Sequence, residues 1–334
     1  MKKRAPVVER FLGWIEPRLG QLPMLQRVYA ERDHYRALAR KSFAMDLSQR
    51  IQASSAAVKM ITSREPSERR WLFDALTEAG QTVALAEHGG LCFVVRLGDK
   101  YISRDLYATG QFEFDKVAVA LALLKSRGQS EPAPNLLVDV GANIGSVCIP
   151  AVASGQFDRA IAIEPHPENV RLLRTNIALN GLTEKIDVVA SAVADGPGKL
   201  MLSQSTDNWG DHRTWAGAEN RVEIEVPCIT LDSLDLAGER RHPLIWMDIQ
   251  GAEGRALAGA SELLRRRPPI VVEFWPWAIE RAQCRAELFG SLSGYGRVYD
   301  LNKMPAGPQP ASLEALWREI GIGEDKATDV LLLA

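Results

Sequence analysis

Short hydrophobic runs recur along the chain, and several end in glycine or in an acidic residue. The clearest is LLVDV at 136–140, which is apolar except for Asp139 and leads into a turn that contains Gly141 and Gly145. A continuous apolar run with β-branched residues predicts a parallel strand that is buried on both faces. The glycine turn predicts a ligand crevice at the carboxyl end of that strand.

The same reading assigns elements to most of the chain. It predicts a helical extension over residues 1–80 and an α/β domain over 81–334. Strands are predicted at 82–85, 91–95, 101–104, 136–140, 161–164, 186–190, 244–249, 270–274, 297–299 and 329–333. Helices are predicted up to Leu124 and at 146–153, 167–180 and 253–266, with a polar insert at 196–223. Strands that alternate with helices imply a mostly parallel sheet with helices on both faces.

The helical extension has three interpretations. It is a packing or oligomerising appendage that supports a homo-oligomer, a lid over the substrate, or a membrane-surface contact through Phe11, Trp14 and Ile15.

Charge and cysteine content restrict the function classes. The 334 residues carry a net charge of −2, so no broad basic surface for nucleic acid is expected. The four cysteines are far apart, which predicts free thiols in a reducing compartment. No secretion signal or bilayer-spanning run is found, and a cytoplasmic protein without stable membrane insertion is expected.

The turn after residue 140 reads D-x-G-x-N-x-G, with Asn143 where a dinucleotide fingerprint requires glycine. The acid Asp139 would repel a pyrophosphate and attract a sulfonium or an ammonium group. Glu164 follows about 20 residues later, where a carboxylate can hold a ribose diol. These features favour S-adenosylmethionine over a nicotinamide cofactor.

Further candidates stand where other strands end. Asp248 is the preferred catalytic residue, as a base on a hydroxyl or as a substrate anchor, and Glu273 and Glu253 are additional candidates. Glu253 has an equal alternative as a helix-start residue, because its charge suits the helix dipole. Ion pairs with arginine are the structural alternative for Asp139, Glu164 and Glu273. Ser191 and Ala192 are predicted to lie near the adenine.

The polar insert and the segment after residue 274 contain aromatic residues that suit a sugar or another polyol. The predicted substrate-binding residues are Trp209, His212, Arg213, Trp215 and Trp275. Packing beneath the loop is the alternative for any single tryptophan. No histidine has partners at ligand spacing, so no metal site is expected.

Together these motifs resemble the FkbM family of S-adenosylmethionine-dependent methyltransferases of class I. The resemblance rests on 110–113, 138–145, Glu164-Pro165, Asn176, Asn180, 247–253 and 269–273. It covers about Thr82 to the C-terminus. One departure is Gln250, where the family usually has glutamate.

The resemblance implies a Rossmann-like sheet of seven strands whose last strand is antiparallel. It also implies O-methylation of a hydroxyl on a small molecule, a glycan or a natural product (EC 2.1.1.-). The implied cofactor-binding residues are Glu113, Asp139, Gly141, Ala142, Asn143, Gly145, Glu164, Pro165, Ser191, Ala192 and Asp248. Alternatives are a nicotinamide-dependent oxidoreductase, a non-catalytic carbohydrate-binding protein on the same fold, and a magnesium-assisted transferase with Asp248 as ligand.

Overall fold

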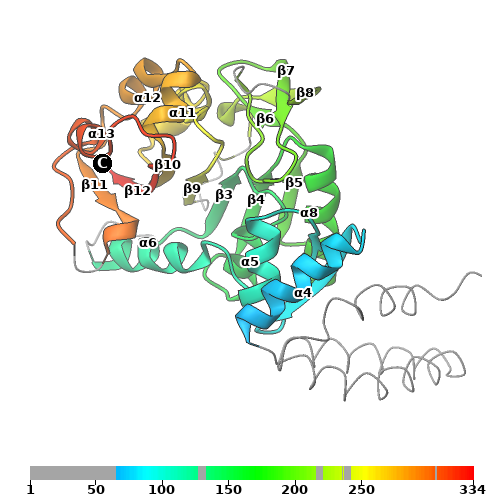
Figure 1. The fold of residues 1–334 in the computed structure, drawn as a ribbon. Helices are drawn as coiled ribbons and strands as arrows, with labels where there is room; N and C mark the ends of the chain where they lie inside the picture. The colour runs from blue at the N-terminus through cyan, green and yellow to red at the C-terminus, as the bar shows by residue number, and fades with distance from the viewer. Residues whose placement is uncertain (1–64, 127–132, 216–220, 235, 237–241, 305–306) are drawn as a thin grey trace, which may run out of the picture.

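A seven-stranded sheet lies at the centre of the molecule (Figure 1). The computed structural model describes residues 65–126, 133–215, 221–234, 236, 242–304 and 307–334. The strand order is β11-β12-β10-β9-β3-β4-β5. The strands are β3 (Leu136–Val140), β4 (Arg159–Ile163), β5 (Ile186–Val189), β9 (Pro243–Met247), β10 (Ile270–Phe274), β11 (Arg297–Asp300) and β12 (Thr328–Leu333). β12 is antiparallel to β10 and β11, and the other neighbours are parallel. The expected α/β sheet with an antiparallel last strand is confirmed.

Helices cover both faces of this sheet because successive strand residues point to opposite sides. Leu137 and Trp246 pack against α6, α7 and α8 on one face. Val138 and Met247 pack against α9 to α13 on the other. The helices are α6 (Phe114–Ser126), α7 (Cys148–Ala153), α8 (Pro167–Leu179), α9 (Glu253–Ala258), α10 (Ser261–Arg265), α11 (Pro276–Arg281), α12 (Arg285–Ser291) and α13 (Leu313–Ile320). Every residue of β3 and β9 is buried, as expected for apolar strands covered on two sides.

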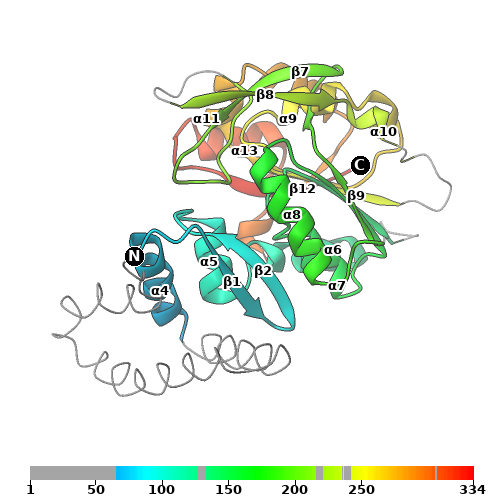
Figure 2. The ribbon, with the colours of Figure 1, turned by 90° about the vertical axis from the view of Figure 1, so that its right-hand side faces the viewer.

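A small module precedes the sheet (Figure 2). It consists of α4 (Pro66–Glu78), β1 (Val83–His88), β2 (Leu91–Arg96) and α5 (Ile102–Thr109). The predicted hairpin is confirmed as the antiparallel pair β1–β2. The strand predicted at 101–104 is wrong, because this segment begins α5. The buried Asp99 carboxylate accepts hydrogen bonds from the amides of Tyr101 and Ser103, and so satisfies donors that a helix start leaves unpaired.

Two asparagines of α8 attach this module to the sheet domain. The Asn176 side chain accepts from the Val94 amide (2.7 Å) and donates to the carbonyls of Val94 (3.3 Å) and Ile144 (3.0 Å). The Asn180 side chain pairs in the same way with the amide (2.9 Å) and carbonyl (2.7 Å) of Cys92. The two amide groups therefore bind the edge of β2 as a neighbouring strand would.

A second sheet, in the order β6-β8-β7, extends from the end of β5. Its strands are β6 (Ala192–Val193), β7 (Gly198–Gln204) and β8 (Val222–Ile229). The polar insert predicted at 196–223 thus contains strand β7, whose Leu202 packs against Val226.

The helix predicted at 253–266 is divided into α9 and α10. Gly259 lies so close to the Ala194 carbonyl that a Cβ would be 2.3 Å from its oxygen. The Asp232 carboxylate then accepts from the amides of Glu262 and Leu263 and starts the second helix. Short 3-10 turns, η1 (Leu231–Ser233) and η2 (Leu301–Lys303), complete the described fold.

Most of the predicted helical extension, residues 1–64, lies outside the described residues. The oligomerising and membrane-contact interpretations rest on those residues and are therefore not tested by the structure. Its last part is α4, which packs on α5 through the rings of Phe73 and Tyr107, 5.7 Å apart. Within the described part of the chain, no helix has the length and apolar character needed to cross a bilayer.

Candidate active site

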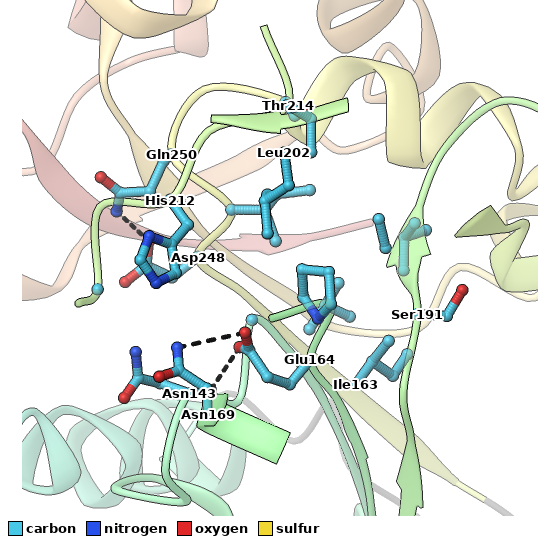
Figure 3. A pocket seen from close by; sticks show the side chains of 18 of the residues that line it. Asn143, Ile163, Glu164, Asn169, Ser191, Leu202, His212, Thr214, Asp248 and Gln250 are labelled. Atoms are coloured by element: carbon cyan, nitrogen blue, oxygen red, sulfur yellow. Dashed lines mark hydrogen bonds between the residues drawn. The ribbon is translucent and has the colours of Figure 1, made fainter. Parts of the chain in front are cut away.

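Two adjoining clefts lie at the carboxyl ends of the parallel strands. The first cleft is lined by residues that follow β3, β4, β5 and β9 and by the loop after β7 (Figure 3). The second cleft is lined by the start of α5, by the segments before α6 and β12, and by the ends of β9 and β10. Ile102, Gly210, Asp248 and Gln250 line both clefts. The two clefts therefore meet at the end of β9.

Glu164 lies at the floor of the first cleft and is 4% exposed. Its carboxylate accepts hydrogen bonds from the Asn143 amide at 2.9 Å and from the side chain of Asn169 at 3.3 Å (Figure 3). It also accepts from the His166 amide at 2.9 Å. Burial raises its pKa to about 7, although these donors act in the opposite direction. Three donors fix the orientation of the carboxylate and leave lone pairs for the hydroxyls of a ligand.

Three residues of the turn after β3 have positive φ, namely Gly141, Asn143 and Gly145. Asn143 has φ 49° and donates from its side chain to the Trp209 carbonyl at 2.8 Å. Gly141 has φ 94°, and a Cβ there would lie 1.9 Å from the Asp248 carbonyl oxygen. The close approach that the glycine allows is thus between the turns after β3 and β9, which together form the cleft.

Asp139 does not line either cleft, contrary to the prediction. It is 2% exposed, and its carboxylate accepts from the Cys148 amide at 3.2 Å. Because Asp139 shares a face of β3 with Leu137, its side chain enters the layer of α7 beneath the crevice. Burial raises its pKa to about 7. Ala142 and Gly145 are likewise absent from the described lining.

The end of the first cleft beyond β5 is mostly apolar. Pro165, Ser191 and Ala192, predicted from the sequence to contact the cofactor, all line it. The apolar residues Ile163 and Leu202 line the same cleft. This end suits a flat heterocycle, whereas Glu164 and Asp248 provide the charge at the other side.

Asp248, Gln250 and Glu273 form a hydrogen-bonded group where the two clefts meet. The Gln250 side chain donates to Asp248 at 2.7 Å and to Glu273 at 3.0 Å. Burial and the charge of Asp248 raise the pKa of Glu273 well above its usual range. A glutamate at position 250 would add a third carboxylate here, while the glutamine bridges the existing two with N–H donors.

Glu253 is fully buried and lines neither cleft. Its carboxylate accepts from the amides of Ile249 (3.0 Å) and Gly251 (3.3 Å). Burial raises its pKa to about 7. Glu253 is the first residue of α9, as in the helix-start interpretation, and its carboxylate also holds the turn after β9.

Trp209 and His212 line the first cleft, although both were predicted to bind the acceptor. The His212 Nδ1 accepts from the Ser205 amide at 3.1 Å, which leaves the proton on Nε2. Burial lowers the pKa of His212 to about 3, so the ring is neutral. Its buried Nε2–H has no partner among the described residues.

The other predicted acceptor residues are divided between packing and the second cleft. Arg213 forms a buried ion pair with Asp211 at 2.5 Å and lies 4.8 Å from the Trp215 ring. The Trp215 Nε1 donates to the Gln250 carbonyl at 2.8 Å, and neither Arg213 nor Trp215 lines a cleft. Trp275 does line the second cleft.

Glu113 was predicted to bind the cofactor, but it lines the second cleft and not the first. Its φ is 59°, and its carboxylate pairs with Lys116 at 3.0 Å.

Two residues of the site were missed from the sequence. Asn169 lines the first cleft and donates both to Glu164 and to the Trp209 carbonyl at 3.1 Å. Asp99 accepts from the Trp209 amide at 3.3 Å and ties that loop to α5. Asn169 could have been found because it lies in the first turn of α8, directly after Glu164-Pro165. Asp99 gives no local signal of this contact, since the loop it holds is distant in sequence.

The first cleft fits S-adenosylmethionine. Its described lining contains Glu164 and Asp248 but no lysine or arginine, so it suits a sulfonium and an ammonium group and offers no cation to a pyrophosphate. Glu164 can hold the ribose diol, and the apolar end beyond β5 the adenine. Neither Asp139 nor Glu164 forms an ion pair within the described residues. That part of the chain also contains no cluster of three or more histidine, cysteine or acidic residues suited to a metal ion.

A match to a known protein family agrees with this assignment. Residues 139–304 match the methyltransferase FkbM domain. No curated protein matches the chain. Among solved structures, the methyltransferase FkbM from Methylobacillus flagellatus is 17% identical with a TM-score of 0.37, over 61% of this chain and 46% of that chain. TYW2 from M. jannaschii in complex with AdoMet is 15% identical with a TM-score of 0.38, over 75% and 85%. An O-methyltransferase from Bacillus cereus in complex with SAH is 13% identical with a TM-score of 0.36, over 68% and 84%.

The chain thus spans about half the length of the Methylobacillus flagellatus structure. The domain match includes the turns after β3, β4 and β9, which are the segments that form the first cleft. Residues 139–304 of this chain form a methyltransferase FkbM domain, and its cofactor is S-adenosylmethionine.

Proposed function

We propose that the enzyme methylates a hydroxyl group of a sugar, a glycan or a related natural product. The main support for this proposal is the position of Asp248, which lines both clefts where they meet. With the cofactor in the first cleft and the acceptor in the second, the carboxylate lies where a hydroxyl must lose its proton. The Gln250 side chain holds this carboxylate in place (Figure 3).

When bound, S-adenosylmethionine supplies an electrophilic methyl group. Glu164 and the turn after β3 would position it, and Asp248 would take the hydroxyl proton as general base. Positioning of two reactants is worth roughly 7–11 kcal/mol. A general base contributes about 10²–10⁴-fold, or about 3–5 kcal/mol. Most of the rate enhancement should therefore come from the two clefts, with Asp248 as a smaller contribution.

The variant Asp248→Asn tests this assignment. It keeps an acceptor oxygen for the Gln250 amide but cannot take a proton, so turnover should fall about 10²–10⁴-fold. Affinity for S-adenosylmethionine should fall by much less, because Glu164 and the apolar end of the first cleft are unchanged. Transfer of labelled methyl to a panel of sugar and polyol acceptors measures the first quantity, and titration calorimetry the second.

Asp187→Asn serves as the matched control, because Asp187 is an exposed acid on β5 paired with Arg159. It should leave both quantities unchanged. Full activity in Asp248→Asn would remove the general base from the proposal. Loss of activity in EDTA would favour a metal-assisted reaction instead.

A further inference from the structure

The lining of the second cleft is strongly acidic. Its described residues include the carboxylates of Glu113, Asp248, Glu273, Glu324 and Asp325, and no lysine, arginine or histidine. Glu324 and Asp325 are exposed at the rim, whereas the other three lie deeper. A bound acceptor would therefore meet carboxyl groups from the entrance to the floor.

Protein cations balance only part of this charge. Lys116 pairs with Glu113 at 3.0 Å and also with Asp329, so one ammonium group serves two carboxylates. The neutral amide of Gln250 bridges Asp248 and Glu273, whose side chains also hydrogen-bond to each other. Burial, together with the charges of Asp329 and Asp248, raises the pKa of Glu113 to about 7, and a cation bound in the second cleft would favour the ionised form of this acid.

The second cleft also contains a donor without an acceptor. Trp275 is 9% exposed and lines the cleft, and its buried indole Nε1–H has no partner among the described residues. An unpaired buried donor is costly, and a ligand oxygen would satisfy it. The ring itself is held by stacking on Trp277, with centroids 5.3 Å apart.

We propose that the acceptor is an amino sugar, a hydroxyl compound that also carries a protonated amine. The ammonium group would pair with the carboxylates of the second cleft, and a ring or hydroxyl oxygen would accept from Trp275. A neutral sugar would satisfy Trp275 but leave the acidic lining unpaired, and an anionic acceptor would be repelled. This inference rests on the proposed function, because it assigns the acceptor to the second cleft.

The test compares a glucosamine trimer with the N-acetylglucosamine trimer of the same linkage. The two trimers have the same hydroxyl groups. They differ at the nitrogen, which is a free, protonated amine in one and a neutral acetamide in the other. Calorimetric titration into the full-length enzyme loaded with S-adenosylhomocysteine should show the glucosamine trimer binding about tenfold more tightly, or better, with the preference falling as salt is added. In the transfer assay, the same trimer should accept labelled methyl from S-adenosylmethionine.

The double variant Glu324→Gln/Asp325→Asn removes only the rim charge. The preference for the glucosamine trimer should fall about 2- to 5-fold, as expected for exposed charges, with affinity for S-adenosylhomocysteine unchanged. Asp158→Asn/Glu184→Gln is the matched control, since these exposed acids precede β4 and β5 at the opposite end of the strands. It should retain the full preference.

Equal or tighter binding of the acetylated trimer, or no binding of either trimer, would overturn the amino-sugar assignment. So would a preference that the rim variant leaves unchanged. Failure of the proposed function would look different. The enzyme would then not bind S-adenosylhomocysteine, or it would methylate no hydroxyl acceptor, charged or neutral.

Discussion

At the scale of single residues, the acids near the site are of two kinds: some line the first cleft, and others hold backbone turns beneath it. Glu164 and Asp248 line the first cleft, whereas Asp139 and Glu253 lie beneath it and accept hydrogen bonds from backbone amides. All four occupy the ends of strands or the turns after them. Whether each acid reaches the crevice is decided by the direction of its side chain and not by its place along the strand.

Glu253 offers a direct test of its supporting role. Its folded-state pKa is raised to about 7 from an ordinary value of 4.5, so the folded protein binds this proton more tightly than the unfolded chain. The stability that comes from the neutral acid is present below the ordinary pKa and is lost as pH rises toward 7. Glu253→Gln removes this titration, and the decline of unfolding free energy between about pH 5 and 7 should flatten by at most about 1 kcal/mol per pH unit.

Urea unfolding across that pH range measures the effect. Methyl-transfer activity of Glu253→Gln should stay within a few-fold of the parent, because the residue lines neither cleft. An unchanged pH slope together with a large loss of turnover would restore Glu253 as a catalytic candidate.

At the scale of elements, the junction between α8 and β2 attaches the N-terminal module to the sheet. The Asn176 side chain is fully buried and makes three hydrogen bonds to backbone groups. Asn176→Ala leaves the Val94 amide and the Ile144 carbonyl without these partners, which costs about 1–3 kcal/mol of unfolding free energy. Hydrogen exchange at the β2 amides should accelerate in this variant while exchange in β3 and β9 is maintained.

The exposed neighbour Thr175 provides the control, since Thr175→Ala removes only a bond to its own helix carbonyl. It should leave exchange in β2 unchanged. Equal protection of β2 in Asn176→Ala would mean that apolar packing of the module, and not the amide pairing, holds the hairpin to α8.

At the scale of the whole molecule, the strand order places the first cleft at the centre of the sheet. The chain passes from β3 to β4 on one side and reaches β9 on the other, so the loops after these strands diverge above the sheet. Such a reversal of strand order is where open α/β sheets bind ligands. Residues far apart in sequence, such as Glu164 and Asp248, meet there as a result.

The sequence predicted this core because parallel strands buried on both faces, such as 136–140 and 270–274, are continuous apolar runs. It failed where a single side chain decides the structure. The segment 101–104 has residues that suit a strand, but Asp99 starts a helix there. The direction of the Asp139 side chain could have been predicted from the alternation along β3. The location of Trp209 and His212 in the first cleft could not, because it depends on contacts between loops that are distant in sequence.

Ligand linkage joins the first cleft to the stability of the entire fold. S-adenosylmethionine at about 100 times its Kd should stabilise the enzyme by about 2.7 kcal/mol, because it binds only the folded chain. For a domain of this size, that corresponds to a rise in Tm of roughly 5–10 °C by scanning calorimetry. Glu164→Ala removes the acceptor of the proposed ribose hydrogen bonds and should weaken affinity roughly 10- to 100-fold.

At the same cofactor concentration, the variant should therefore gain less than about half of the parent's stabilisation. Each protein is compared with its own ligand-free form, so the effect of removing a buried acid on basal stability cancels. Asp158→Asn, at the opposite end of the sheet, should keep the full shift. A full shift in Glu164→Ala would show that the ribose is held elsewhere, and the assignment of the first cleft would then have to rest on Asp248 and the apolar end beyond β5.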